Sequence, residues 1–236
     1  MTIEAGIIAA GEGSRLAKSH PSTVKALIPV AGRPLSHWVV DGLRAAGCGK
    51  LTILTNSRGG GVAPSLSAAF TDIEFDFITA DTTSSFESFR LVSLRIAETK
   101  EDFVVSTVDA LIQPEDVSRF INECRATKAR AGIALTLHVD DEKPLWADVD
   151  EVGVVTAVGP DAKTRRAVTC GLYYLTRSAA RRLPEASAHG RLRDFWTALV
   201  ASGERVSGVT MSKTIDVDRP VDLQAAELFL TTEMRP

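Results

Sequence analysis

A glycine-rich turn near the start of the chain has the residue types that a phosphate group needs. The apolar run of residues 5–10 is followed by Gly11 and Gly13, then by Arg15 and, further along, by Lys25. Two glycines let the backbone turn sharply, so that successive N–H groups can point at phosphate oxygens. Arginine adds a planar fork of donors, and lysine adds a compact positive charge. This order of residues predicts a site for a nucleoside triphosphate.

Two other glycine-rich phosphate motifs do not fit this chain. A dinucleotide fingerprint places its third glycine at the position of Leu16, whose side chain would hold helix and strand apart. A Walker A loop needs Gly-Lys followed by Ser or Thr, but Gly49 and Lys50 are followed by Leu51. Arg44 also stands where the first glycine of that loop belongs. The remaining alternative is a glycine turn that merely carries surface charges.

The spacing of these residues continues into a longer pattern. Residues 11–16 read Gly-x-Gly-x-Arg-Leu, and residues 25–35 read Lys-x-Leu-x-Pro-Val-x-Gly-x-Pro-Leu. Together they resemble the opening of the sugar-phosphate nucleotidyltransferases, also called NDP-sugar pyrophosphorylases. In that family the glycine-rich loop wraps the triphosphate and the lysine binds phosphate oxygens during transfer. Val24 replaces the family's usual proline, which loosens the loop without removing the charge. The resemblance implies catalytic roles for Arg15 and Lys25.

The resemblance also implies which residues bind the nucleotide. The residues of the loop, with the lysine that follows it, are Ala9, Ala10, Gly11, Glu12, Gly13, Ser14, Arg15 and Lys25. Ser84 and Ser85 fall where many family members have Gly-Thr before a helix, in a region that contacts the nucleotide. Small hydroxyl residues at a helix start equally well serve as caps, so both alternatives remain open for these serines.

Asp109 is a candidate ligand for a magnesium ion. Transfer to the α-phosphate of a triphosphate spreads negative charge over the nucleophile and the leaving pyrophosphate, so catalysis is mainly positioning and charge neutralisation. Mg²⁺ is usually held by one or two carboxylates. Asp109 follows the expected strand 103–108, and open α/β sheets bind ligands at the carboxyl ends of their strands. The family holds its metal with an aspartate at such a position, usually after glycine, where this chain has Val108. The alternative is a turn or capping aspartate.

Residues 214–223 offer a second carboxylate. They are similar to the family's late segment Asp-x-x-Thr-Pro-x-Asp-Leu, whose first aspartate joins the metal site, and this implies Asp216. Asp218 remains an alternative, because strand alternation sends both aspartates to the same face. Arg219 stands at the usual threonine position, and an acid in this segment could instead cap the helix that begins at Pro220.

The acceptor side is implied by two shorter segments. Residues 169–173, Thr-Cys-Gly-Leu-Tyr, resemble the family's Asn-Ala-Gly-Ile-Tyr near the sugar, which implies Thr169 and Gly171. Glycine permits close approach of a ligand to the strand. Lys143 belongs to a Glu-Lys-Pro sequence that matches an acceptor motif in letters, but it precedes residues 152–154, whereas in the family it follows them. Lys143 is kept as a candidate for the acceptor phosphate.

The elements that must position these residues alternate between strand and helix. This pattern predicts an α/β fold with a Rossmann-like, mostly parallel sheet covered by helices on both faces. Strands are expected over residues 5–10, 51–54, 73–78, 103–108 and 206–211, and helices over 35–46, 84–97, 114–126, 177–182, 192–201 and 221–231. Residues 131–139, 149–158 and 168–175 are β-rich, which predicts a small extension of the sheet on the acceptor side. The glycine run 59–61 is expected to be a flexible loop.

Composition agrees with one enzyme domain. A chain of 236 residues with 44% hydrophobic residues can bury one substantial core, so residues 1–236 are expected to form a single domain. A net charge of −3 gives no wide electrostatic footprint for nucleic acid. The three cysteines are too scattered for a disulfide framework or a metal site. With no signal pattern and no long uncharged apolar stretch, we expect a cytoplasmic protein without membrane partners, compatible with a homo-oligomer.

These observations predict a Mg²⁺-dependent nucleotidyltransferase. Its partners would be a nucleoside triphosphate and a phosphorylated small-molecule acceptor, most simply a sugar 1-phosphate, whose phosphate oxygen attacks the α-phosphorus and releases pyrophosphate. The alternative acceptors are a phosphorylated alcohol, of the phosphocholine or inositol phosphate type, and a molybdenum-cofactor precursor. A catalytically silent nucleotide-binding module is the alternative from another class. The base of the triphosphate is left open.

Overall fold

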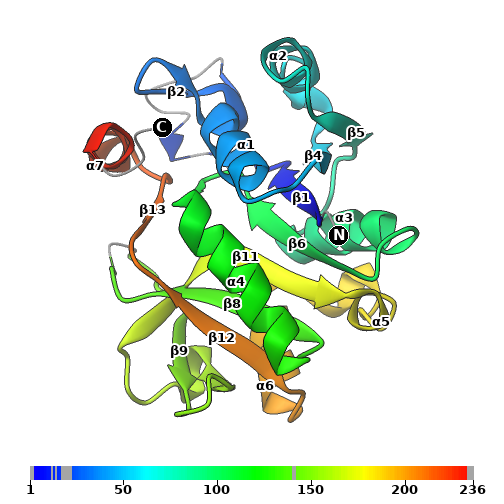
Figure 1. Ribbon diagram of the computed structural model, residues 1–236, viewed down its shortest axis with the longest axis vertical. Coiled ribbons are helices and arrows are strands. Elements are labelled where there is room, and N and C mark those ends of the chain that lie inside the picture. Colours follow the sequence, from blue (N-terminus) through cyan, green and yellow to red (C-terminus); the bar gives the residue numbers. More distant parts are fainter. Residues whose placement is uncertain (1–2, 12, 14, 17–22, 140–141, 233–236) are drawn as a thin grey trace.

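A nine-stranded sheet forms the centre of the molecule. The computed structural model describes residues 3–232, apart from residues 12, 14, 17–22 and 140–141. The strands run in the order β10-β9-β11-β6-β1-β4-β5, with β8 beside β11 and β12 beside β8 (Figure 1). Their bounds are β1 Glu4–Ala9, β4 Lys50–Thr55, β5 Glu74–Thr79, β6 Asp102–Thr107, β8 Ala131–Thr136, β9 Trp146–Val149, β10 Val155–Val158, β11 Ala167–Thr176 and β12 Val206–Met211.

The sheet has a parallel half and a mixed half. Strands β5, β4, β1 and β6 pair in parallel, as βαβ connections require. Strand β11 then pairs antiparallel with β6, β8 and β9, so the β-rich extension expected on the acceptor side is continuous with the parallel half. The predicted α/β class, with its Rossmann-like sheet, is confirmed.

Helices cover both faces of this sheet. Their bounds are α1 Leu35–Ala45, α2 Val62–Ala69, α3 Ser85–Ala97, α4 Pro114–Thr127, α5 Arg177–Ala180, α6 Leu192–Ala201 and α7 Pro220–Thr232. Neighbouring residues of one strand enter different cores: Ile7 joins the cluster under α1 and α4, whereas Ile8 joins the cluster under α3 and α6. Figure 1 shows α1 and α4 in front of the sheet and α3 behind it. Burial on both faces explains why these strands read as continuous apolar runs.

Several short elements differ from the sequence expectation or were not part of it. The glycine run 59–61, expected to be a loop, ends a short 3₁₀ turn, and α2, a helix for which there was no expectation, follows it directly. The segment 149–158 contains a tight turn between β9 and β10, in which the Asp150 carboxylate accepts hydrogen bonds from the N–H groups of Val152 and Val154. A pair of three-residue strands, β7 Ala110–Ile112 and β13 Thr214–Asp216, was not expected at all. A hairpin of two-residue strands, β2 Pro29–Val30 and β3 Arg33–Pro34, precedes α1.

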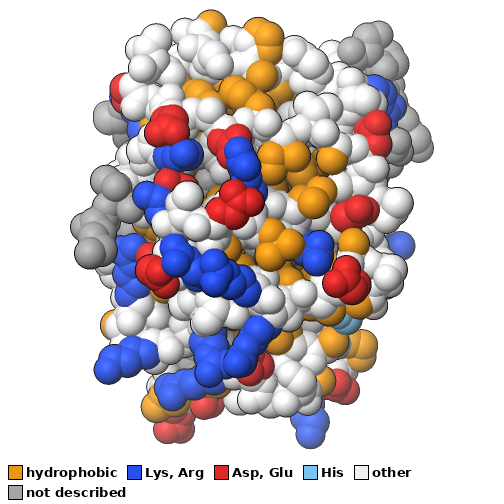
Figure 2. All heavy atoms as spheres, turned by 90° about the vertical axis from the view of Figure 1, so that its right-hand side faces the viewer, with side chains coloured by type: hydrophobic (Ala, Val, Ile, Leu, Met, Phe, Trp, Pro, Cys, Tyr) orange, Lys and Arg blue, Asp and Glu red, His pale blue; other side chains and the backbone are white. Residues whose placement is uncertain are grey.

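The surface mixes charges of both signs. On the face shown in Figure 2, Lys and Arg side chains gather in the lower part, with acidic side chains among them. The net charge of −3 therefore includes local concentrations of positive charge. Within the described part of the chain, no helix combines the length and the hydrophobicity needed to cross a membrane.

Candidate active site

Asp109 lies just beyond the carboxyl end of β6. Strand β6 is flanked by β1 on one side and by β11 on the other, so this end of it lies at the middle of the sheet. Open α/β sheets bind ligands at such a place. The backbone carbonyl of Asp109 accepts a hydrogen bond of 3.1 Å from the N–H of Val217. This bond, with the pairing of β7 and β13, brings the late segment of the chain to Asp109.

Three carboxylates converge at this point. One oxygen from each of Asp109, Asp216 and Asp218 lies within 4.8 Å of the others. Asp216 ends β13, and the buried Val217 between the two later aspartates faces the core, as strand alternation requires. The structure thus brings both candidates for the second carboxylate to Asp109. Carboxylate oxygens so close together are hard donors of the kind that Mg²⁺ prefers, so these residues fit that ion.

Lys25 is the cation at the centre of this carboxylate cluster. It lies in the short 3₁₀ turn Lys25–Leu27, its side chain is only 6% exposed, and its Nζ pairs with Asp109 and with Asp218. Burial alone would lower the pKa of Lys25, but the charges of the three aspartates raise it well above its ordinary value. Burial opposes ionisation of Asp109 as well, yet the pKa of Asp109 is lowered by Lys25. The pair is therefore ionised at neutral pH.

The glycine-rich loop passes close to Lys25. Gly13 has a φ of +56°, and a Cβ there would come within 3.0 Å of the Lys25 Cβ, so both backbone and space favour glycine. Arg15 extends from the same loop and places Nη1 3.3 Å from Asp218. Its side chain is 47% exposed, so this contact is a weak surface pair that a ligand can displace.

Asp222 has a structural task beside the cluster. It is the third residue of α7, and its carboxylate accepts hydrogen bonds from the N–H groups of Asp218 and Arg219 at 3.0 and 2.7 Å. It also pairs with the Arg219 guanidinium at 2.7 Å. The reciprocal half of a capping box has this geometry. Asp222 therefore begins the helix and fixes the backbone that carries Asp218.

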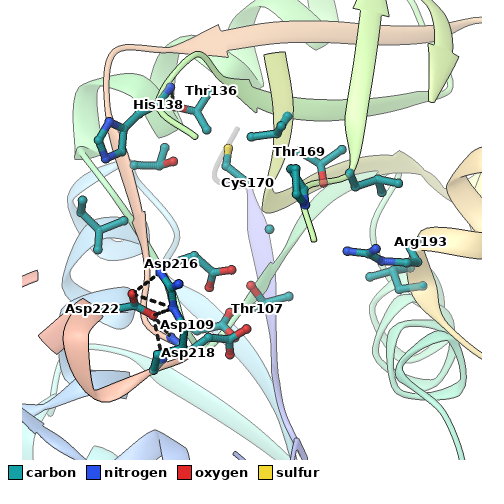
Figure 3. Close-up of a pocket in the computed structure, with 18 of the residues that line it drawn as sticks. Thr107, Asp109, Thr136, His138, Thr169, Cys170, Arg193, Asp216, Asp218 and Asp222 are labelled. Carbon is teal, nitrogen blue, oxygen red and sulfur yellow. Dashed lines mark hydrogen bonds and ion pairs between the residues drawn. The ribbon is translucent and has the colours of Figure 1, made fainter. Parts of the chain in front are cut away.

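A cavity of about 350 Å³ opens beside the carboxylates. Figure 3 shows Asp109, Asp216 and Asp218 on one side of it and Arg193 on the other. Gly171, which also lines the cavity, has a φ of +78°, and a Cβ there would lie 2.4 Å from the Thr107 Oγ1. The pairing of β11 with β8 shifts register between Thr169 and Tyr173, so the strand bulges where it lines the cavity.

The predicted nucleotide-binding residues occupy several places. Arg15 and Ser85 line the cavity, and Ala9 ends β1. The carbonyl of Ala10 accepts a hydrogen bond from Asn56. Gly11 is exposed, whereas Glu12 and Ser14 lie outside the described residues. Ser84 is the N-cap of α3 and accepts from the N–H of Glu87, so the capping alternative holds for its hydroxyl.

The predicted acceptor residues separate in the structure. Thr169 and Gly171 line the cavity. Lys143 is exposed and does not belong to the cavity lining, although its backbone carbonyl accepts a hydrogen bond from Arg193. Sequence reasoning missed several cavity residues, among them Thr107, Thr136, His138, Arg191 and Arg193. The signal that could have found the arginines is two cations at the start of a helix, where the helix dipole disfavours positive charge.

Comparisons with known proteins give one matching family and several similar structures. The model of the MobA-like NTP transferase domain matches residues 5–203. No curated protein sequence matches the chain. A candidate glucose-1-phosphate thymidylyltransferase from Bacillus anthracis has a similar structure, with a TM-score of 0.84, 21% identity, and coverage of 98% of this chain and 96% of that chain.

Two further structures are similar over nearly their whole length. The UDP-glucose pyrophosphorylase from Acinetobacter baumannii has a TM-score of 0.80 and 18% identity, with coverage of 99% of this chain and 95% of that chain. The inositol-1-phosphate CTP transferase from T. maritima has a TM-score of 0.76 and 18% identity, with coverage of 96% and 94%. At these identities the likeness shows the fold.

Proposed function

Because this chain belongs to the family of MobA-like NTP transferase domains, we propose that it transfers a nucleoside monophosphate from a triphosphate to a phosphorylated small molecule. A phosphate oxygen of the acceptor attacks the α-phosphorus, and pyrophosphate leaves. The acceptor is most simply a sugar 1-phosphate. The reaction depends on Mg²⁺.

The observation that carries this proposal is the meeting of Lys25 with three carboxylates beside a cavity. Asp109, with Asp216 or Asp218, would hold Mg²⁺ through carboxylate oxygens. When bound, the ion supplies positive charge to the phosphate oxygens of the triphosphate. A nucleotide-binding module without chemistry needs no such cluster, so the cluster favours an enzyme over a silent module.

Lys25 and Arg15 provide positive charge from the protein itself. Lys25 is already ionised and buried, so its charge needs little reorganisation as negative charge develops on the transferred group. Arg15, which is more exposed, would contact the triphosphate from the glycine-rich loop. No protein nucleophile is required, because a phosphate monoester is itself anionic near neutral pH.

The functional domain is proposed to comprise residues 1–236. The family model ends at residue 203, whereas Asp216 and Asp218 lie beyond it. Strand β13, which ends at Asp216, pairs with β7 directly after Asp109. The last segment therefore completes the carboxylate cluster, and a chain cut at residue 203 should lose activity.

The acceptor class is the least constrained part of the proposal. The similar structures bear the names of a thymidylyltransferase for glucose 1-phosphate, a UDP-glucose pyrophosphorylase and a CTP transferase for inositol 1-phosphate. All three names indicate a phosphorylated, hydroxyl-bearing partner. Thr107, Thr136 and Thr169 give the cavity hydroxyl groups that suit such a molecule. A phosphorylated alcohol or a molybdenum-cofactor precursor remains the alternative acceptor.

The test is a matrix of the four common triphosphates against glucose 1-phosphate, inositol 1-phosphate and phosphocholine. We expect Mg²⁺-dependent release of pyrophosphate with one pair, and regeneration of the triphosphate when pyrophosphate is added to the product. A chelator should abolish both directions. Tight triphosphate binding with no pyrophosphate release across the acceptors, and no reversal, would contradict the proposal and favour a silent module.

A further inference from the structure

Arg193 carries a positive charge into the acceptor side of the cavity. It stands in the first turn of α6, its side chain is half-buried, and it lines the cavity. Figure 3 shows it across the cavity from Asp109, Asp216 and Asp218. Its Nη2 donates a hydrogen bond of 2.9 Å to the carbonyl of Lys143, which fixes the guanidinium without neutralising it.

Other half-buried arginines of this protein are neutralised by carboxylates. Arg125 pairs with Asp102, and Arg219 pairs with Asp222. Within the described residues, no carboxylate pairs with Arg193. A cation also stands unfavourably at the positive end of a helix. The local potential at this wall of the cavity is therefore positive and suits an anion.

The charge of Arg193 also acts on Tyr173, another residue of the cavity lining. Tyr173 lies on β11 and lines the cavity. Burial raises the pKa of its hydroxyl, the charges of Asp109 and Asp216 raise it further, and Arg193 acts in the opposite direction. The aspartates and the arginine thus act in opposite directions on the pKa of one hydroxyl. A phosphorylated acceptor that reaches the carboxylates needs a cation on its own side, because its phosphate is anionic and the cluster is acidic.

Arg191 lies two residues earlier and differs from Arg193 in pairing and in exposure. It also lines the cavity, but its Nε and Nη2 donate two hydrogen bonds to Asp194, both 3.1 Å long, and its side chain is 68% exposed. Its charge is balanced and solvated. The two arginines therefore form a matched pair in which only Arg193 offers free donors to a ligand.

We propose that Arg193 binds the phosphate of the acceptor and holds it in position for attack, with the Lys143 carbonyl orienting the guanidinium. This role rests on the proposed function and adds a specificity-determining residue to it. Thr169 and Thr107 would contact the neutral hydroxyl groups of the same acceptor. An uncharged analogue should then gain nothing from Arg193.

The experiment is calorimetric titration of glucose 1-phosphate and inositol 1-phosphate into the full chain, with glucose and inositol as uncharged controls. In Arg193→Gln we expect the dissociation constant of the phosphate ester to rise about 10- to 100-fold, the range for loss of a charge-assisted hydrogen bond. Arg193→Lys should recover part of the affinity, because it restores the charge without the fork. Arg191→Gln should bind like the wild type.

Turnover and triphosphate binding separate this inference from the proposed function. Arg193→Gln should raise KM for the acceptor and leave the binding of Mg²⁺ and triphosphate unchanged. If Arg193→Gln binds the phosphate ester as tightly as the wild type does, Arg193 has no phosphate role. The same holds if the variant loses affinity for glucose or inositol by the same factor as for the phosphate ester. A wild-type protein that binds neither ester also overturns the inference. Absence of triphosphate binding and pyrophosphate release in the wild type contradicts the proposed function itself.

Discussion

Strand β6 has a cluster of polar side chains around an aspartate at each end, and the two clusters are built differently. At its start, Asp102 receives two hydrogen bonds from the Arg125 guanidinium, the longer at 3.0 Å, and one of 3.0 Å from the Tyr174 hydroxyl. Just beyond its other end, Asp109 lies with two more aspartates around Lys25. The first cluster matches one negative charge with one positive charge. The second combines three acids with Lys25 and the exposed Arg15.

The difference lies in what the cluster leaves available to a ligand. Hydrogen bonds from Arg125 and Tyr174 lower the pKa of Asp102, although burial acts in the opposite direction. These partners occupy the carboxylate and balance its charge. The Asp109 cluster keeps excess negative charge and opens on the cavity, so it can accept a cation. Both sites contain an ionised, partly buried aspartate with a lowered pKa. Charge balance and access, rather than the pKa, distinguish a structural pair from a candidate active site.

The largest effect should follow loss of the central cation. We predict that Lys25→Met lowers turnover by about two to three orders of magnitude, as when one preorganised charge-stabilising group is removed. It should also lower the melting temperature, because three carboxylates then repel one another, and Mg²⁺ should raise that temperature more than it does in the wild type. Steady-state kinetics and thermal melts measure both. Lys50→Met, at a surface pair with Glu74, is the control and should change neither. Full turnover in Lys25→Met would remove this residue from the mechanism.

The second prediction tests whether the acidic end acts as one unit. Asp109→Asn and Asp216→Asn should each lower turnover by about 100-fold and require more Mg²⁺, whereas the double variant should lose far less than the product of the two. Mg²⁺ titrations of the two single variants and the double variant measure this. If the loss of turnover in the double variant equals the product of the two single losses, the two aspartates do not share one ion. If Asp218→Asn shows the Mg²⁺ dependence and Asp216→Asn does not, the second ligand is Asp218.

A smaller effect is expected at the exposed edge of the same cluster. Arg15→Gln should weaken triphosphate binding about tenfold, with a smaller change in turnover, since a charge-assisted hydrogen bond to phosphate is lost at a solvated position. Arg44→Gln is the matched control, because that side chain is equally exposed, at 47%, and pairs with Asp72 elsewhere on the surface. Equal affinities in the two variants would show that Arg15 does not contact the nucleotide.

The smallest effect on activity should come from the balanced cluster. Asp102→Asn should leave turnover within about twofold and lower the free energy of unfolding by about 1–2 kcal/mol, the order expected for charge-assisted hydrogen bonds that are partly solvated. Because the folded pKa of Asp102 lies below its ordinary value of 3.8, this stabilisation is present above that pH and is lost as pH falls through the folded pKa. Denaturant unfolding at several pH values should show a constant difference between wild type and variant near neutrality, shrinking in acid. A large loss of turnover in Asp102→Asn would show that this cluster is not merely structural and would contradict the distinction between the two clusters.

Much of the parallel half could be predicted from the sequence. The apolar run at residues 5–10 predicts a strand because both of its faces are buried. The strand before Asp109 could be predicted for the same reason, and so could the place of Asp109 at its end. The helix at Leu192–Ala201 and the strand at Val206–Met211 have the expected bounds. In these places local pattern and tertiary packing agree.

The rest depends on contacts between distant segments. Strands β7 and β13 have three residues each and carry too little periodicity to be recognised, yet they bring Asp216 to Asp109. Asp216 and Asp218 could not be separated by spacing, since alternation sends both to one face. The place of Arg193 in the cavity depends on how α6 packs beside β10 and α3, which no local pattern reports. Ser84 was ambiguous because capping and ligand binding favour the same residue types.

Strand β11 has a mechanical consequence for how this cavity can work. One continuous strand pairs with β6, which leads to Asp109, and with β8 and β9 of the β-rich extension, so a single hydrogen-bonded ladder links these two parts of the sheet beside the cavity. Two lobes hinging around the substrate would have to break that ladder. We therefore expect substrates to enter a preformed cavity, with adjustment confined to side chains and loops. Small-angle scattering should show the same radius of gyration with and without triphosphate and Mg²⁺, and a compaction on binding would show that the strand yields.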